Sequence, residues 1–142
     1  MATKVKPFRA RSLSMGKQME ALIRDFPIST GNLGGNSKLV WIGKVQPTPL
    51  SAAYTIQIMY RASQMPTVHV VEPTLRTREG KRLPHVFHGR ALCLYRAKYG
   101  EWNSSKLISS TILTWTSLWL AHYEIWLSTN VWCGSKAEHP IG

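Results

Sequence analysis

The sequence predicts an α+β protein, with an antiparallel meander of three to four strands flanked by an N-terminal helix and C-terminal helices. Three observations lead to this prediction. Apolar residues recur at helical spacing near the N-terminus, alternate with a period of two across the middle of the chain, and return to helical spacing after residue 104. Short turns between successive strands indicate that neighbouring strands run antiparallel.

The first predicted element is an amphipathic helix in the stretch SMGKQMEALIRDF, residues 14–26. Its apolar positions fall on one face: Met15, Met19, Leu22, Ile23 and Phe26. Ser12 or Ser14 can cap the first turn, and Pro27 prevents the helix from continuing. The chain therefore opens with a helix that buries one face.

A loop and three strands are predicted next. The stretch STGNLGGNS, residues 29–37, is rich in Gly and Asn, which favour turns, and we predict a loop there. The stretches KLVWIGKVQ, AAYTIQIMYR and TVHVVEP alternate or are β-branched, and each predicts a strand. Prolines separate the first two strands and Pro73 closes the third.

Helical spacing returns from Ser104 onward. One stripe contains Ile108, Ile112, Trp115, Trp119, His122 and Trp126. The tryptophans of this region, Trp132 included, are interpreted as core, and His122 as a hydrogen-bonded core histidine, because no Cys or carboxylate stands at metal-ligand spacing from it. Eight polar residues interrupt the stretch 107–127, so we expect a buried helix and no membrane span.

Composition and charge limit the function classes. A chain of 142 residues is long enough for one core, and we expect a basic arm at residues 1–12 and a single domain at residues 13–142. The formal charge of +11 attracts acidic partners. Nucleic-acid binding is the less favoured explanation of this charge, because solvated basic loops such as RTREGKR, residues 76–82, are commoner. The two cysteines and the lack of an apolar N-terminal run favour the cytoplasm.

Three stretches carry a resemblance to a known family: GKVQPTPLSAAYTIQIMYRASQMPTVHVVEP, then LPHVFHGRALCLY, then EW ahead of a helix. Together they are similar to the ubiquitin-conjugating enzyme superfamily, whose members hold a modifier as a cysteine thioester and pass it to an amine. The resemblance covers about residues 13–127 and implies that superfamily's fold. Pro84 takes the place of the proline in the family's His-Pro-Asn motif, His85 that of its Asn, Cys93 that of the nucleophile, and Trp102 falls one residue late.

Leu83 replaces the motif His, and this departure resembles the bacterial branch of the superfamily. That branch includes stand-alone conjugating-enzyme-like proteins from antiviral operons beside a cyclic-oligonucleotide synthase. The resemblance implies that a protein with a C-terminal glycine, the synthase itself, is joined to an amine-bearing target. No cofactor or metal is implied.

The chemistry of such a site can be stated from the residues. A thiolate attacks an activated acyl group and leaves when an amine attacks, so the site needs an accessible cysteine and donors for the oxyanion. Cys93 is the candidate nucleophile and His85 the candidate oxyanion donor; His88 is a weaker one. Cations close in sequence would favour the thiolate: Arg90, Arg96 and Lys98.

Four functions remain open from the sequence. They are a thioester-forming conjugating enzyme, an inactive binding module of the same fold, a Cys-His hydrolase and a basic nucleic-acid-binding domain. The hydrolase lacks an identifiable third residue to orient the histidine. The nucleic-acid domain lacks a wet stacking face, because Tyr54, Ile56, Ile58 and Tyr60 form a face too apolar to stay exposed. Cys133 has no catalytic context and is interpreted as structural.

Overall fold

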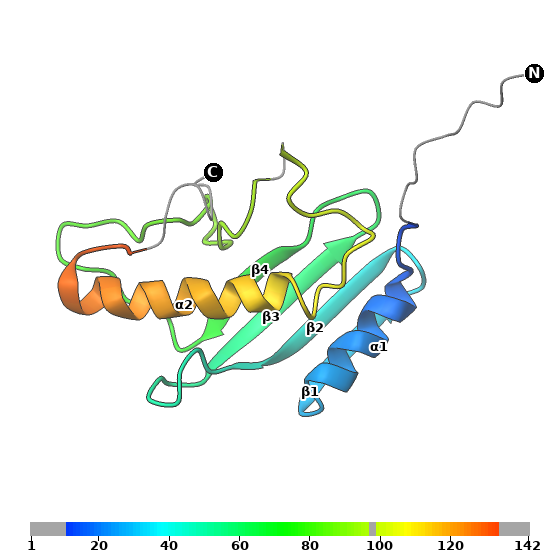
Figure 1. The fold of residues 1–142 in the computed structure, drawn as a ribbon, viewed down its shortest axis with the longest axis horizontal. Helices are drawn as coiled ribbons and strands as arrows, with labels where there is room; N and C mark the ends of the chain where they lie inside the picture. The colour runs from blue at the N-terminus through cyan, green and yellow to red at the C-terminus, as the bar shows by residue number, and fades with distance from the viewer. Residues whose placement is uncertain (1–10, 97–98, 134–142) are drawn as a thin grey trace, which may run out of the picture.

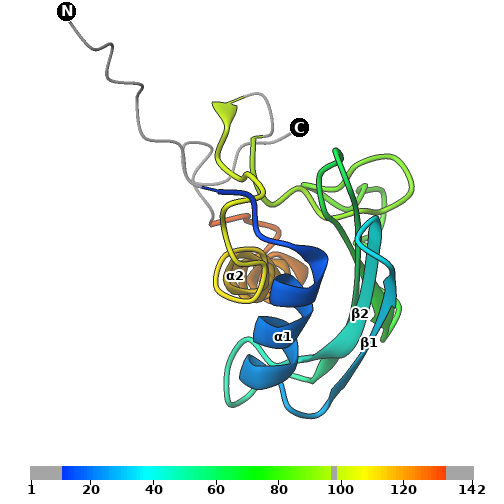
Figure 2. The ribbon, with the colours of Figure 1, turned by 90° about the vertical axis from the view of Figure 1, so that its right-hand side faces the viewer.

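The computed structural model describes residues 11–96 and 99–133. The elements follow in the order α1 (Met15–Asp25), β1 (Ser29–Gly34), β2 (Lys38–Val45), β3 (Tyr54–Arg61), β4 (Thr67–Glu72) and α2 (Ile112–Thr129) (Figure 1). The strands form one antiparallel sheet in the order β1-β2-β3-β4. Both helices lie on the concave side of this sheet (Figure 2). The predicted α+β class is confirmed, whereas the predicted arm at residues 1–12 lies almost wholly outside the described residues.

Strands β2 and β3 bury one face each, as their alternation predicts. The buried side chains are Leu39, Trp41, Val45, Tyr54, Ile56, Ile58 and Tyr60. They form the floor of the core on which the helices pack. Because this face is covered, it offers no surface on which nucleic-acid bases could stack.

The loop predicted at residues 29–37 is wrong, because most of it is strand β1. Ser29 pairs with Gly43 of β2 and Gly34 pairs with Lys38, with Gly35 in the turn at φ 59°. The side chains of this edge strand are mostly exposed, so the sequence carries no apolar alternation. The ladder to β2 holds the strand, together with a 2.9 Å hydrogen bond from the Trp41 indole N–H to Ser29 Oγ.

Helix α1 begins where the sequence predicts, but the side chains that it buries differ in part from the predicted apolar face. Ser14 is its N-cap, and its hydroxyl accepts a hydrogen bond from the Lys17 amide. Ile23, predicted on the apolar face, is 37% exposed, whereas Gln18 is completely buried. The Gln18 amide donates to Lys106 O at 2.8 Å and accepts from the Ile108 amide at 2.9 Å. A polar side chain therefore links α1 to the segment that leads into α2.

Helix α2 begins at Ile112, eight residues after the predicted start at Ser104. Two hydrogen bonds account for the later start, one of them from helix α1. The Ile108 amide is bound to Gln18, and Thr111 Oγ1 donates to Leu107 O at 2.6 Å, so this backbone is held in turns.

The predicted apolar stripe of α2 is confirmed by the burial of Ile112, Trp119 and Trp126. On another face of the helix, the Glu124 carboxylate accepts hydrogen bonds from Tyr54 Oη and Ser51 Oγ, which ties α2 to the sheet. Among the described residues, no helix combines the length and apolarity needed to cross a bilayer.

Candidate active site around Cys93

A short hairpin positions the candidate nucleophile. Val86 and Leu92 form an isolated antiparallel bridge, and the turn between them contains Gly89 at φ 86° and Arg90 at φ 66°. The Leu92 amide donates to Val68 O of β4 at 2.9 Å. The hairpin is therefore attached to the edge of the sheet, and Cys93 follows directly from its second arm.

The structure brings the two predicted site residues together. The His85 carbonyl accepts hydrogen bonds from the Cys93 amide and from the Trp119 indole N–H, each at 3.0 Å. His85 has φ 56°, in the left-handed region that few residues other than glycine adopt. One carbonyl thus joins the loop before the hairpin, the cysteine segment and helix α2.

Cys93 lies in the wall of a small, mostly aromatic cavity. Its lining residues are His85, Cys93, Leu94, Trp115, Trp119, His122 and Trp132. The cavity has about 10 Å³ of space, which is roughly the room that one water molecule needs. Cys93 itself is only 3% exposed. The expectation of an accessible thiol is therefore wrong for the conformation described.

Trp132 forms one side of this enclosure. Asn130 ends α2 with φ 62° and turns the chain back, so that Trp132 packs among the site residues. Its ring centroid lies 4.5 Å from that of His85, 5.3 Å from Trp119 and 5.8 Å from His122. The sequence indicated Trp132 and His122 only as core residues, and the turn that brings Trp132 back to the cysteine has no clear sequence signal.

Of the cations near Cys93 in sequence, the two that the structure describes, Arg90 and Arg96, are not among the lining residues of the cavity. The Arg90 guanidinium donates to Leu75 O at 3.2 Å, and the Arg96 guanidinium lies 5.2 Å from the Tyr99 ring centroid. His88 is exposed at the hairpin turn, and Lys98 lies outside the described residues. The predicted electrostatic activation by neighbouring cations has no support in this geometry.

Two further positions discussed from the sequence, Trp102 and Cys133, lie outside the lining of the cavity. Trp102 is 2% exposed; its indole N–H donates to Thr111 Oγ1 at 3.0 Å and its ring meets Tyr60 edge-on. Cys133 is exposed. Within residues 11–96 and 99–133, no cluster of three or more His, Cys, Asp or Glu could hold a metal ion.

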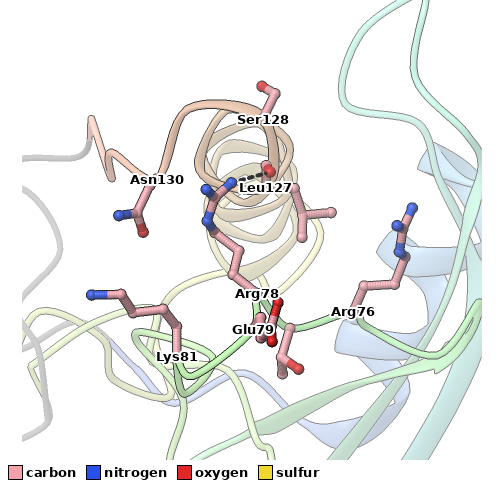
Figure 3. A pocket seen from close by; sticks show the side chains of 8 residues that line it. Arg76, Arg78, Glu79, Lys81, Leu127, Ser128 and Asn130 are labelled. Atoms are coloured by element: carbon pink, nitrogen blue, oxygen red, sulfur yellow. Dashed lines mark hydrogen bonds between the residues drawn. The ribbon is translucent and has the colours of Figure 1, made fainter.

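The basic segment at residues 76–82 lines a second, open hollow of about 530 Å³ at the end of α2. Figure 3 shows Arg76, Arg78 and Lys81 around it, with the Arg78 side chain reaching toward the end of the helix. Arg78 Nη1 donates to Leu127 O at 2.5 Å. A cation at the carbonyl end of a helix is favourable, so Arg78 fastens this segment to α2.

The chain was compared with known protein families and with curated proteins. A family model described as Type II CBASS E2 protein matches residues 18–140, which is most of the chain and includes both cysteines. The comparison with curated proteins gives no significant match.

Proposed function

The chain belongs to the family of type II CBASS E2 proteins, and on that premise we propose that it carries an acyl group as a thioester on Cys93 and transfers it to an amine. The family places the chain among ubiquitin-conjugating-like proteins of antiviral defence. We propose three further points: that a thioester forms, that Cys93 carries it, and what the acyl group is transferred to.

The observation that carries this proposal is the pairing of His85 with Cys93. The sequence spacing singled out these two residues by resemblance to a conjugating-enzyme motif, and in the fold the His85 carbonyl accepts the Cys93 amide at 3.0 Å. Both side chains line one small cavity whose wall is mostly aromatic. A low-dielectric site of this kind strengthens the interactions that stabilise a charged intermediate.

The proposed roles follow from the chemistry. The Cys93 thiolate attacks an activated acyl carbon, and the His85 imidazole donates a hydrogen bond to the oxyanion that forms. The attacking amine then displaces the thiolate. Because Cys93 is covered in the described conformation, part of the cavity wall has to move before an acyl donor can reach the sulfur, and we propose that this part is Trp132.

The proposed donor is a protein with a C-terminal glycine, and the best candidate is the cyclic-oligonucleotide synthase of the same defence system. This assignment comes from the resemblance to stand-alone bacterial conjugating enzymes. The described fold lacks any sign of an adenylation site of its own, since no Gly-rich phosphate loop occurs in the sequence. The acyl group therefore arrives already activated.

Adduct analysis of Cys93 tests this proposal. The protein is isolated from its host under non-reducing conditions at low pH, and intact mass is measured before and after treatment with dithiothreitol. We expect a thiol-sensitive adduct on the wild type, a thiol-resistant oxyester on Cys93→Ser, and none on Cys93→Ala. Cys133→Ala is the matched control and should keep the adduct. An adduct that follows Cys133 and ignores Cys93 would overturn the proposal.

One observation favours a second candidate, an inactive binding module of the same fold. The 3% exposure of Cys93 is typical of a cysteine that serves as core filler. In that case Cys93→Ala would lose about 1 kcal/mol or more of unfolding free energy through a small cavity and leave partner binding intact. The same adduct experiment separates the two candidates, because a module of this kind carries no thiol-sensitive adduct.

A further inference from the structure

We propose that His122 is a catalytic residue of this site, the general base that accepts the proton of the Cys93 thiol and later that of the attacking amine. This inference rests on the proposed thioester chemistry and adds the residue that makes it possible near neutral pH. The sequence suggested only a structural role for His122, as a histidine on the apolar stripe of α2.

The first argument is position. His122 lines the same cavity as Cys93, and both of its ring nitrogens are buried there. It lies one helical turn after Trp119, whose indole N–H is bound to the carbonyl that also holds the Cys93 amide. Helix α2 and the cysteine segment are therefore fixed relative to each other, and His122 keeps its place opposite the thiol.

The second argument is the composition of the cavity wall. Helix α2 contributes Trp115, Trp119 and His122, the segment after it contributes Trp132, the loop before the hairpin contributes His85, and the cysteine segment contributes Cys93 and Leu94. Among the described residues of this wall, the titratable groups are two imidazoles and one thiol, with no carboxylate, lysine or arginine. Of the described lining side chains, the two histidines are the ones that can accept a proton from the thiol.

The third argument separates the two histidines. An oxyanion donor must present an N–H, whereas a base must present a bare nitrogen, so the two tasks need different groups. The His85 backbone is bound to the Cys93 amide, and the His85 ring packs on Trp132 in the same cavity wall. His122, on the helix across the cavity, is left for the proton. The cavity has room for about one water, which can relay a proton over a gap too wide for direct contact.

The proton balance is complete. In loading, the Cys93 S–H bond breaks, its proton passes to the His122 imidazole, and the thiolate forms a bond to the acyl carbon. The donor's leaving group departs with its electron pair and takes that proton from His122, which returns to the neutral imidazole. In discharge, the amine nitrogen bonds to the acyl carbon, the C–S bond breaks, and the thiolate leaves with the electron pair. The surplus proton on the nitrogen passes to the neutral His122 imidazole and from there to the released Cys93 thiolate, so both groups return to their starting state. Imidazole suits both steps because it gains and loses a proton near neutral pH.

The test measures Cys93 reactivity without any acyl donor. The full chain carries Cys133→Ser, so that the exposed thiol does not compete, and Cys93 alkylation by iodoacetamide is followed by mass spectrometry from pH 5 to pH 10. We expect His122→Gln to move the midpoint of the rate profile toward about pH 8.5, the ordinary range of a thiol, and to slow alkylation at pH 7 about tenfold or more. Glutamine keeps much of the bulk and hydrogen-bonding capacity, and it cannot take the proton.

His88→Gln is the matched control, because His88 is exposed at the hairpin turn and lines no part of the cavity. Its rate profile should equal that of the parent. An unchanged midpoint in His122→Gln would overturn the assignment. If that variant does not fold, NMR titration of the His122 ring in the parent and in Cys93→Ser gives the answer, since loss of the thiolate should lower the midpoint of the ring. Equal midpoints would also overturn it.

Failure of the assignment is distinguishable from failure of the proposed function. A shifted alkylation profile together with no thiol-sensitive adduct in the host would keep His122 as the group that activates Cys93 and remove the thioester chemistry. A thiol-sensitive adduct together with an unshifted alkylation profile would keep the thioester chemistry and remove His122 as the group that activates Cys93. In transfer assays, loss of the base should slow loading and discharge by about 10²-fold or more, whereas His85→Ala should slow discharge with loading largely preserved.

Discussion

Removing the Trp132 ring should open the way to Cys93. Cys93 is 3% exposed, so alkylation in the parent requires a local opening of the cavity wall, and we expect that opening to lift Trp132 from its neighbours. The two closest ring contacts, to His85 at 4.5 Å and to Trp119 at 5.3 Å, resist that opening. Such contacts contribute about 0.5–1.5 kcal/mol each, so Trp132→Ala should make opening easier by about 1–3 kcal/mol, which corresponds to about 5- to 150-fold.

The assay is the rate of Cys93 alkylation by iodoacetamide at one fixed pH in the Cys133→Ser background. Val131→Ala is the matched control, because Val131 is adjacent in the chain and 56% exposed. Thermal unfolding is recorded for each variant, so that a general loss of stability is not mistaken for a local opening. An alkylation rate in Trp132→Ala within twofold of the parent would refute the reasoning, because it would mean that another part of the wall shields the sulfur.

Two further predictions concern stability. Gln18→Ala should lower the unfolding free energy in urea by about 2–4 kcal/mol, because it leaves a buried amide and a partly buried carbonyl without their partner; a loss under about 1 kcal/mol would contradict this. Burial raises the pKa of Tyr95 from 10.0 to about 12. The stabilisation of the fold by the neutral Tyr95 phenol is therefore complete below pH 10 and is lost as the pH rises toward about 12. The fall in unfolding free energy over that interval should be smaller in Tyr95→Phe, and an equal fall would argue against it.

The sequence predicted the elements whose burial follows a regular period. Alternation in β2 and β3 and helical spacing in α1 correspond to faces that are buried in the fold. Strand β1 was not predicted, because its side chains are mostly exposed and its position depends on pairing with β2 more than on its own composition. The start of α2 escaped it because Gln18, from another element, binds the Ile108 amide.

The candidate site was predictable only where local sequence determines the geometry. His85 and Cys93 are joined by a hairpin of local origin, so their spacing along the chain was informative. His122 and Trp132 reach the cavity through the packing of α2 and through a left-handed turn at Asn130, both of which depend on the tertiary structure. The burial of the Cys93 thiol could not be predicted from its neighbours Leu92 and Leu94, because leucines can flank an exposed cysteine as well as a buried one.

The left-handed backbone at His85 restricts which amino acids this position can accept. A β-branched or bulky apolar side chain is strained at φ 56°, whereas glycine, Asn, Asp and His tolerate that region best. Of these, glycine has no side chain to donate a hydrogen bond, and an ionised Asp would repel an oxyanion. Asn and His therefore remain. The motif that this chain resembles has Asn here and this chain has His, so the exchange preserves the backbone shape of the loop while it introduces a group that can change its charge.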